Sequence, residues 1–308
     1  MSTALHLREE GVDVAIVEAM EPGWGASGAQ QWTGDPDIVA AGSDDIIARH
    51  GAAGERFVAL LRDSASVLFD VVRRYQIQAE QEQAGWVQPV HSPGRASGSP
   101  NGACDSGRNS ARRSSCSLAR RRPGKCWDRM PGSAVSGTRP AGHINPLALS
   151  RGLARVVLDR GGRIYARSPA ASFERRGDRW VVKTDKGEIS GRALIVATNA
   201  YTGEFSKSLM PAIAHEVMPV LSWQMATQPL SDNVRKSVIP GRQAMSDTHG
   251  ELYFARYDAR NRLVTGGAVI GPGNKAERLK LRSRSGCRGC GRRSGRSISI
   301  MSGTAMSE

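Results

Sequence analysis

Residues 12–28, VDVAIVEAMEPGWGASG, decide the fold of this chain. The β-branched run at their start predicts a strand buried on both faces, and this strand ends at an acidic residue, Glu18. In a dinucleotide-binding βαβ unit the second strand ends in this way, because a carboxylate there accepts hydrogen bonds from the ribose hydroxyls of the adenosine. Taken alone, the pattern also fits an ordinary strand that happens to end in a carboxylate, and the later motifs must decide.

The segment before this strand predicts the end of a helix. Ser2 to Glu10 carries apolar residues among polar ones and stops at Gly11, a typical helix C-cap. In dinucleotide-binding units the glycine fingerprint precedes the acidic residue by about 20 residues. We therefore expect the first strand and its G-x-G-x-x-G turn to fall upstream of Met1.

The charge of this 308-residue chain is unevenly distributed. The formal net charge is +14, which by itself suggests a nucleic-acid partner. Most of the excess lies in residues 94–141 and 278–308, which are rich in Arg, Ser and Gly and contain all five cysteines, while the rest of the chain is close to neutral. Such compositions bury too little apolar surface to offset the entropy of ordering, so we expect both segments to lack stable packing.

Three interpretations of these two basic segments are open. Their abrupt edges and their Arg, Ser, Gly and Cys enrichment favour translation in a shifted reading frame, which the nucleotide sequence would test. A zinc site at Cys287 and Cys290 lacks a second ligand pair, so no metal is expected. A nucleic-acid-binding protein is the alternative function, although Trp127 is the only aromatic residue in either segment.

The remaining chain alternates between helical and strand patterns. Helical spacing predicts a helix from about Ala52 to Tyr75, and a second helix that begins at Asn145-Pro146 and ends at Gly161-Gly162. Strand patterns, several of them separated by turn residues, cover residues 85–91, 163–165, 171–174, 180–184 and 188–190, and the last three predict an antiparallel meander.

An apolar run after the meander predicts another buried strand. Residues 193–201, ALIVATNAY, end in small side chains, which let a backbone approach a ligand at the carboxyl edge of a sheet. A tight strand-to-loop turn without any ligand explains the same residues. Residues 206–275 are rich in strand patterns and predict a separate sheet that faces the substrate.

Together these motifs, with GWVQPVHS, GHINPLALSRGLA and LYFARYDARNRLVTGG, resemble the FAD-dependent oxidoreductases of the D-amino-acid oxidase type. Within that family the chain is similar to the bacterial branch of gamma-glutamylputrescine oxidoreductase-type amine oxidases. The resemblance implies an α/β (α+β) fold: a Rossmann-like doubly wound FAD-binding domain that lacks its first strand, a β-meander and a partial antiparallel substrate domain. It also implies oxidation of a C–N bond of an amine or amino acid.

The resemblance assigns FAD contacts but no catalytic residue. Glu18 matches the acid that binds the ribose, and either Ala170 or Ala171 matches the backbone that meets the adenine. The loop over the pyrophosphate and flavin matches Gly25, Ala26, Ser27 and Gly28. The strand end that lies against the cofactor matches Ala197, Thr198 and Asn199. His143 opens a helix at the domain junction, where a purely structural histidine that bonds a loop carbonyl is at least as good an explanation.

Several family features are absent or altered, so we expect a degraded fragment with little FAD and weak or no activity. The glycine loop is missing, Ala29-Gln30-Gln31 replaces the usual residues after GASG, and the basic tail replaces the final strand. The expected organisation, in chain order, is an FAD-binding part (residues 1–80), a substrate-domain strand (81–93), a basic segment (94–141), a second FAD-binding part (142–205), a partial substrate domain (206–277) and a basic tail (278–308).

Composition also bounds the partners and the location. No apolar run approaches the roughly 18 residues of a membrane span, and no signal peptide is visible, so we expect a cytoplasmic protein without a membrane partner. The expected partner is a small amine or amino acid, with no specific nucleic acid. Nothing in the sequence indicates the oligomeric state.

Overall fold

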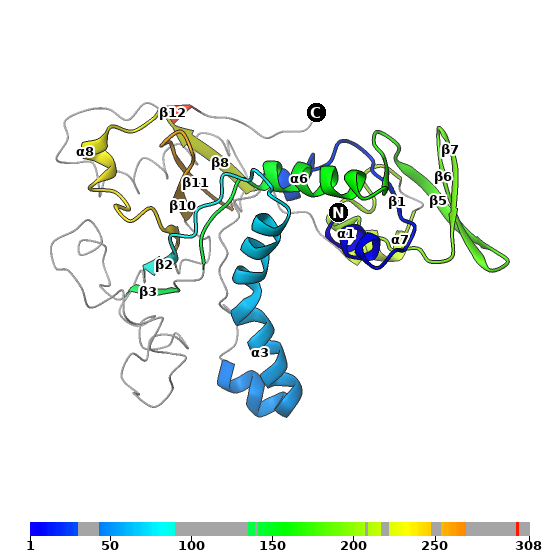
Figure 1. The fold of residues 1–308 in the computed structure, drawn as a ribbon, viewed down its shortest axis with the longest axis horizontal. Helices are drawn as coiled ribbons and strands as arrows, with labels where there is room; N and C mark the ends of the chain where they lie inside the picture. Colours follow the sequence, from blue (N-terminus) through cyan, green and yellow to red (C-terminus); the bar gives the residue numbers. More distant parts are fainter. Residues whose placement is uncertain are drawn as a thin grey trace. The chain divides into compact units, whose positions relative to one another are not determined.

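The computed structural model shows two compact units, which are described in turn (Figure 1). The first unit comprises Met1–Gln30, Ile77–Ala79 and Pro146–Val220. The second comprises Gln31–Gln76, Glu80–Asn145 and Leu221–Glu308. The structure describes residues 1–29, 43–89, 135–138, 141–206, 209–216, 222–247, 254–268 and 300–301.

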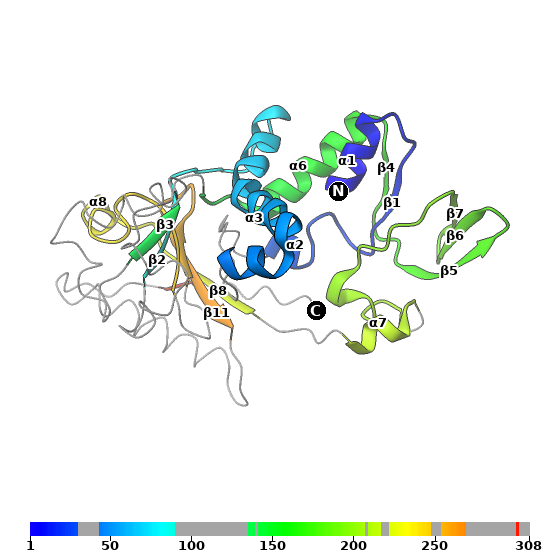
Figure 2. The same ribbon diagram turned by 90° about the horizontal axis from the view of Figure 1, so that it is seen from below.

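Two helix-to-strand passages form the centre of the first unit. α1 (Ser2–Glu9) leads into β1 (Ala15–Val17), and α6 (Pro146–Asp159) leads into β4 (Arg163–Tyr165). The two strands pair in parallel, and Figure 2 shows α1 and α6 side by side next to them. The predicted helices and strands are confirmed, and the parallel pairing is the kind that helical crossovers produce.

The burial of β1 differs from the expectation of a strand buried on both faces. All three residues of β1 are only half-buried, and Val12 just before it is 40% exposed. Within the described part of the chain β1 pairs with β4 alone. A strand with one paired edge is covered less completely than a central strand, so the prediction of full burial is wrong.

Helix α6 is anchored by small and apolar contacts. Leu5 of α1 and Val157 of α6 are fully buried. Gly152 lies so close to Ile77 that an added Cβ would stand 2.2 Å from its Cγ2 atom. The helix ends before Gly161, whose φ of 74° lies in the left-handed region that favours glycine, as the sequence predicted.

The predicted meander is confirmed. β5 (Ala170–Arg176), β6 (Arg179–Thr184) and β7 (Gly187–Gly191) form a three-stranded antiparallel sheet. Gly177, with φ of 64°, makes the first turn, as expected for a residue that must adopt a left-handed conformation. Three short helices complete this unit: α2 (Ala26–Ala29), η3 (Asn199–Tyr201) and α7 (Pro211–Glu216).

The second unit is built on a seven-stranded mixed sheet. Its order is β12-β8-β11-β10-β9-β2-β3, and every neighbouring pair is antiparallel except β2 with β9. The short helix α8 spans Asp232–Arg235. The strands are β2 (Trp86–Pro89), β3 (Val135–Thr138), β8 (Ser222–Thr227), β9 (Ala244–Ser246), β10 (Phe254–Tyr257), β11 (Leu263–Ala268) and β12 (Ile300–Met301).

The long helix α3 (Ser43–Arg74) groups with this sheet and not with the first unit. Gly51, with φ of 53° and ψ of −133°, is not helical and divides α3 in two. The part after Gly51 agrees with the helix predicted from about Ala52 to Tyr75, and a further helical stretch precedes it. Phe69 in the C-terminal part of α3 is buried. It packs closely on Gly142, because a Cβ added at Gly142 would lie 2.8 Å from the Cζ atom of Phe69. The expected division of the chain at residues 80 and 205 stays a prediction.

Parts of the two basic segments belong to the sheet. β3 falls within residues 94–141 and pairs with β2, and Ala141 is fully buried, so the end of that segment is packed, contrary to expectation. β12 falls within residues 278–308 and pairs with β8. The five cysteines and the other residues of both segments lie outside the described residues, as does the nucleic-acid alternative that depends on them.

Candidate functional site

The first candidate site lies at the carboxyl end of β1, around Glu18. The backbone of Glu18 extends the parallel pairing, because its N–H donates to the Tyr165 carbonyl at 2.9 Å and its carbonyl accepts from the Ser168 N–H at 2.9 Å. Its Oε1 accepts the Met20 N–H at 3.2 Å. No described residue hydrogen-bonds Oε2, so one carboxylate oxygen can accept from a ligand hydroxyl.

The start of α1 lies near the same carboxylate. Burial lowers the pKa of the Met1 amino group, and the nearby charge of Glu18 opposes this effect only in part. No side chain caps the first turn of α1. The carboxyl end of a parallel strand and the beginning of a helix thus meet at one place, the usual arrangement of a nucleotide site in α/β proteins.

The loop that carries Gly25 to Gly28 is held by two other parts of the first unit. The Ala26 N–H donates to the Tyr201 hydroxyl at 3.0 Å, and a Cβ added at Gly25 would lie 2.8 Å from the ring of Tyr201. A Cβ at Gly28 would lie 2.0 Å from the carbonyl oxygen of Gly23, so no other side chain fits there without moving the backbone. Gly28 is therefore required by close backbone packing, whereas Gly25 leaves room for the Tyr201 side chain.

Aromatic and hydroxyl groups complete the support of this loop. The ring of Trp24 lies 5.8 Å from that of Tyr201 and 5.6 Å from that of Phe205, measured between centroids. The Ser150 hydroxyl on α6 donates to the Ser27 carbonyl at 3.2 Å. The structure therefore brings the GASG loop together with the segment that follows Asn199. The sequence predicts cofactor contacts for both stretches, but separately.

The prediction of a buried strand at residues 193–201 is wrong. Residues 193–198 form no strand, with Ile195 61% and Val196 39% exposed, and Ala197 is also exposed. Asn199 has φ of 49° and opens η3, while the Thr198 and Thr202 hydroxyls lie 2.7 Å apart. A strand needs a neighbour to accept its backbone hydrogen bonds, and none of the described residues supplies one here.

The two alanines expected near the adenine lie at the start of the meander. Ala170 is half-buried and begins β5, two residues after the Ser168 that bonds Glu18. The Ala171 carbonyl accepts the Ser206 hydroxyl at 2.9 Å. The structure therefore brings Glu18 close to the chain just before Ala170, while the role of either alanine toward a cofactor stays a prediction.

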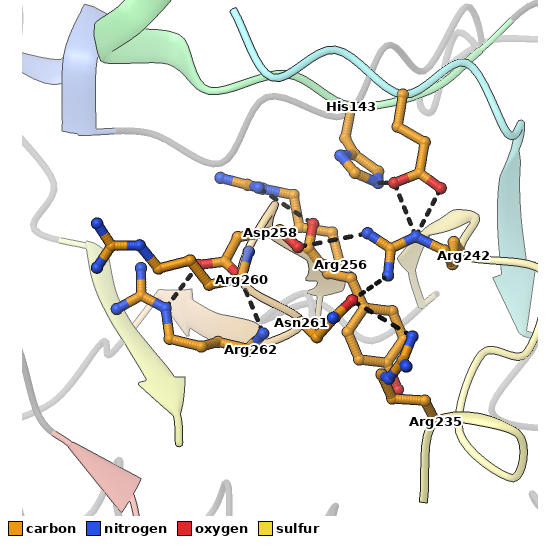
Figure 3. Close-up of polar contacts among 10 residues, drawn as sticks. His143, Arg235, Arg242, Arg256, Asp258, Arg260, Asn261 and Arg262 are labelled. Carbon is orange, nitrogen blue, oxygen red and sulfur yellow. Dashed lines mark hydrogen bonds and ion pairs between the residues drawn. The ribbon is translucent and has the colours of Figure 1, made fainter. Parts of the chain in front are cut away.

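The second unit contains a buried polar cluster that the sequence did not identify as a site (Figure 3). Arg242 Nε lies 2.7 Å and 2.9 Å from the two carboxylate oxygens of Glu82. Arg262 Nε lies 2.6 Å from Asp258 Oδ2, and Asp258 Oδ1 also accepts the Arg260 and Arg262 N–H groups. The only signal in the sequence was the density of arginines in residues 256–262.

His143 lies in this cluster and is 2% exposed. Glu82 Oε2 lies 3.6 Å from the Nε2 atom of His143, and neither ring nitrogen completes a hydrogen bond. The backbone of Arg242 is near the ring and raises the pKa of His143 slightly. Burial, and then the charge of Arg256, lower the pKa of His143 to about 4, against a smaller opposing effect of Glu82. The ring is therefore neutral at pH 7.

Two kinds of site are not found in the described part of the chain. No group of three or more His, Cys, Asp or Glu residues there could hold a metal ion. No described helix is long and apolar enough to cross a membrane. The Cys287 and Cys290 pair lies outside the described residues.

Comparisons with known proteins agree on one family. The family model described as "FAD dependent oxidoreductase" matches residues 1–285. Gamma-glutamylputrescine oxidoreductase of Escherichia coli (strain K12) is 28% identical over 279 residues, which is 88% of this chain and 62% of that protein. A probable oxidoreductase OrdL of Haemophilus influenzae is 27% identical over 278 residues, 86% of this chain and 62% of its own length. The chain thus spans about 62% of the length of these curated relatives.

Solved structures show the same fold at lower identity. L-proline dehydrogenase from P. horikoshii superposes with a TM-score of 0.66 at 14% identity, over 98% of this chain and 78% of that one. Iminodiacetate oxidase from Chelativorans sp. BNC1 gives a TM-score of 0.64 at 16% identity, over 98% of this chain and 80% of that one. At such identities the likeness concerns the fold alone.

Proposed function

The chain belongs to the family of FAD-dependent oxidoreductases, and from this membership we propose that its first unit binds the adenosine end of FAD at the carboxyl end of β1. The observation that carries the proposal is the position of Glu18, which ends a parallel strand, lies near the start of α1 and keeps one carboxylate oxygen without a described partner. A carboxylate in this position accepts hydrogen bonds from the ribose hydroxyls.

The described residues fit one part of the cofactor better than another. Glu18 suits the ribose, and the backbone at Ala170 or Ala171 is proposed to meet the adenine. The loop Gly25, Ala26, Ser27 and Gly28, with Ala197, Thr198 and Asn199, is proposed to lie along the pyrophosphate and flavin. For the pyrophosphate, the described residues offer no glycine-rich strand–turn–helix, which normally provides several backbone N–H donors, so we expect weak retention of FAD.

The proposed reaction is oxidation of a C–N bond in a small amine or amino acid. Bound FAD would accept a hydride equivalent from the carbon next to the nitrogen, and the protein would position the cofactor and exclude water. The support for this substrate class is the family, together with a relative named for gamma-glutamylputrescine. We assign no acid–base catalyst, and we propose that this chain has weak or no activity.

A binding experiment with matched variants tests the ribose assignment. We expect the purified chain to carry far less than one FAD per molecule, and added FAD to bind in preference to FMN, which lacks the adenosine. Glu18→Ala should weaken FAD binding by about 10- to 100-fold, because a hydrogen bond to a charged group contributes about 1.5–3 kcal/mol. Glu21→Ala is the control, since Glu21 forms a surface ion pair with Arg167.

Two results would contradict the proposal. If Glu18→Ala and Glu21→Ala bind FAD equally well, Glu18 does not hold the ribose. If FMN binds as tightly as FAD, the adenosine does not contribute and the site at β1 is not used. Full FAD occupancy on purification would refute the expectation of weak retention.

A further inference from the structure

Tyr201 connects two stretches of the first unit that are far apart in the sequence. Its hydroxyl accepts the Ala26 N–H at 3.0 Å, across a separation of 175 residues. Its ring fills the space that a side chain at Gly25 would need, and it lies 5.8 Å from the ring of Trp24. One side chain therefore contacts three successive residues at the start of the GASG loop, through a hydrogen bond, close packing and an aromatic pair.

The two ends of the GASG loop are held by different elements. Toward Gly28 the support comes from α6, because the Ser150 hydroxyl donates to the Ser27 carbonyl at 3.2 Å. At the start of the loop, the Ala26 N–H donates to Tyr201. A backbone amide carries a single N–H, so the Tyr201 hydroxyl takes the one donor that the loop offers at this position. The orientation of the loop start therefore depends on Tyr201.

Tyr201 is itself held by the residues just before and after it. Its N–H donates to the Thr198 carbonyl at 3.1 Å, and the Thr202 hydroxyl donates to the Asn199 carbonyl at 2.6 Å. Thr202 is 4% exposed, so this turn is anchored in the interior of the unit. Tyr201 thus belongs to the same hydrogen-bonded turn as Thr198 and Asn199, which the proposed function places against the cofactor.

We propose that Tyr201 is a positioning residue for FAD, which holds the GASG loop and the turn at residues 198–202 in one arrangement. The inference rests on the proposed function, in which both stretches lie along the pyrophosphate and flavin. A loop that is already ordered before FAD binds loses less conformational entropy on binding, so the affinity is higher. The ring of Tyr201 supplies contact area, and its hydroxyl fixes the orientation of the loop backbone.

Amide hydrogen exchange of the full chain without FAD tests the contact itself. Tyr201→Phe keeps the ring and removes the hydroxyl, so residues 24–29 should exchange about fivefold faster, the effect of one lost hydrogen bond between uncharged groups. Tyr257→Phe is the matched control, because the Tyr257 hydroxyl donates to the Val238 carbonyl at 2.8 Å in the second unit. This variant loses a comparable hydrogen bond, and the exchange of residues 24–29 should stay as in the wild type.

Titration with FAD and with AMP tests the consequence for the cofactor. Tyr201→Phe should bind FAD about fivefold more weakly than the wild type or Tyr257→Phe, because part of the binding free energy is then used to order the loop. AMP carries the adenosine but no flavin, so Tyr201→Phe should bind AMP as the wild type does. Glu18→Ala should weaken the binding of both ligands, since Glu18 is proposed to hold the ribose that they share.

The possible results separate the role of Tyr201 from the proposed function. Unchanged exchange of residues 24–29 in Tyr201→Phe would overturn the positioning role. The same holds if this variant binds FAD as tightly as the wild type, or if its AMP binding falls as much as its FAD binding. The proposed function fails instead if the wild type binds no AMP, or if Glu18→Ala binds both ligands as the wild type does. If the wild type binds no FAD, both proposals are overturned.

Discussion

The buried ring of His143 should make the second unit sensitive to mild acid. In the folded chain the pKa of His143 is lowered from 6.5 to about 4 by burial and by the charge of Arg256. The unfolded chain has no such environment, so its histidine takes up a proton at its ordinary pKa. Between these two values the unfolded state binds more protons than the folded state. Stability is therefore complete above pH 6.5 and is lost as the pH falls toward 4.

The size of this effect follows from the two pKa values. Integrated between about pH 7 and about pH 4.5, the difference in proton binding should lower the free energy of unfolding by roughly 2 kcal/mol. His143→Gln keeps a polar side chain of similar size but cannot titrate. The variant should therefore lose less stability than the wild type over the same pH interval, by about that amount.

Urea denaturation at the two pH values measures this difference in the free energy of unfolding. Tryptophan fluorescence follows the unfolding, because Trp86 is fully buried in the sheet of the folded chain. NMR of the imidazole gives the pKa of His143 directly, and Arg256→Met should raise it by removing a nearby positive charge. The reasoning is refuted if wild type and His143→Gln lose equal stability between the two pH values. A ring that titrates near 6.5 in the folded protein would refute it as well.

Three further substitutions, two of them with a matched control, test individual contacts. Gly28→Ala should disrupt the GASG loop and lower the yield of folded protein, because the added Cβ meets a backbone oxygen. Gly191→Ala, whose Cβ has its closest contact at 3.3 Å, should be tolerated. Limited proteolysis of the two variants measures the difference. Tyr201→Phe removes one hydrogen bond to the same loop and should cost about 1 kcal/mol in urea denaturation. Arg242→Met should destabilise the second unit by about 1–3 kcal/mol, since it removes the ion-pair partner of the half-buried Glu82 carboxylate. Arg62→Met removes an exposed ion pair with Asp63 and should leave the unfolding midpoint unchanged.

Local sequence rules predicted the elements that are specified locally. Pro146 at the start of α6 and the glycine after its end mark a helix whose boundaries need no tertiary information. The meander was predictable for the same reason, because Gly177 and residues 185–187 form its turns, and its strands are adjacent in sequence. The family resemblance, drawn from motifs in their order and spacing, is confirmed by the family match.

The buried polar cluster could not be predicted in this way. Glu82 and Arg242 are 160 residues apart in the sequence, and their ion pair exists only because two distant segments meet at the sheet. The strand β9, which is only three residues long, gives too short a pattern to read. Residues 256–262 showed an arginine-rich composition, but which of these arginines has a carboxylate partner depends on strand register, which a single sequence does not specify.

Residues 193–198 show why an apolar pattern is insufficient evidence for a strand. Composition can require that such a run avoid water, but a strand forms only where a neighbour completes the backbone hydrogen bonds. In the described part of the first unit this run has no neighbour, and β1 has only β4. Ile195 and Val196 accordingly stay exposed at a cost of about 25 cal/mol per Å² of apolar surface. Among the described residues of this unit, one edge of β1 and this apolar run are thus both without a paired strand, and both features favour pairing with another strand.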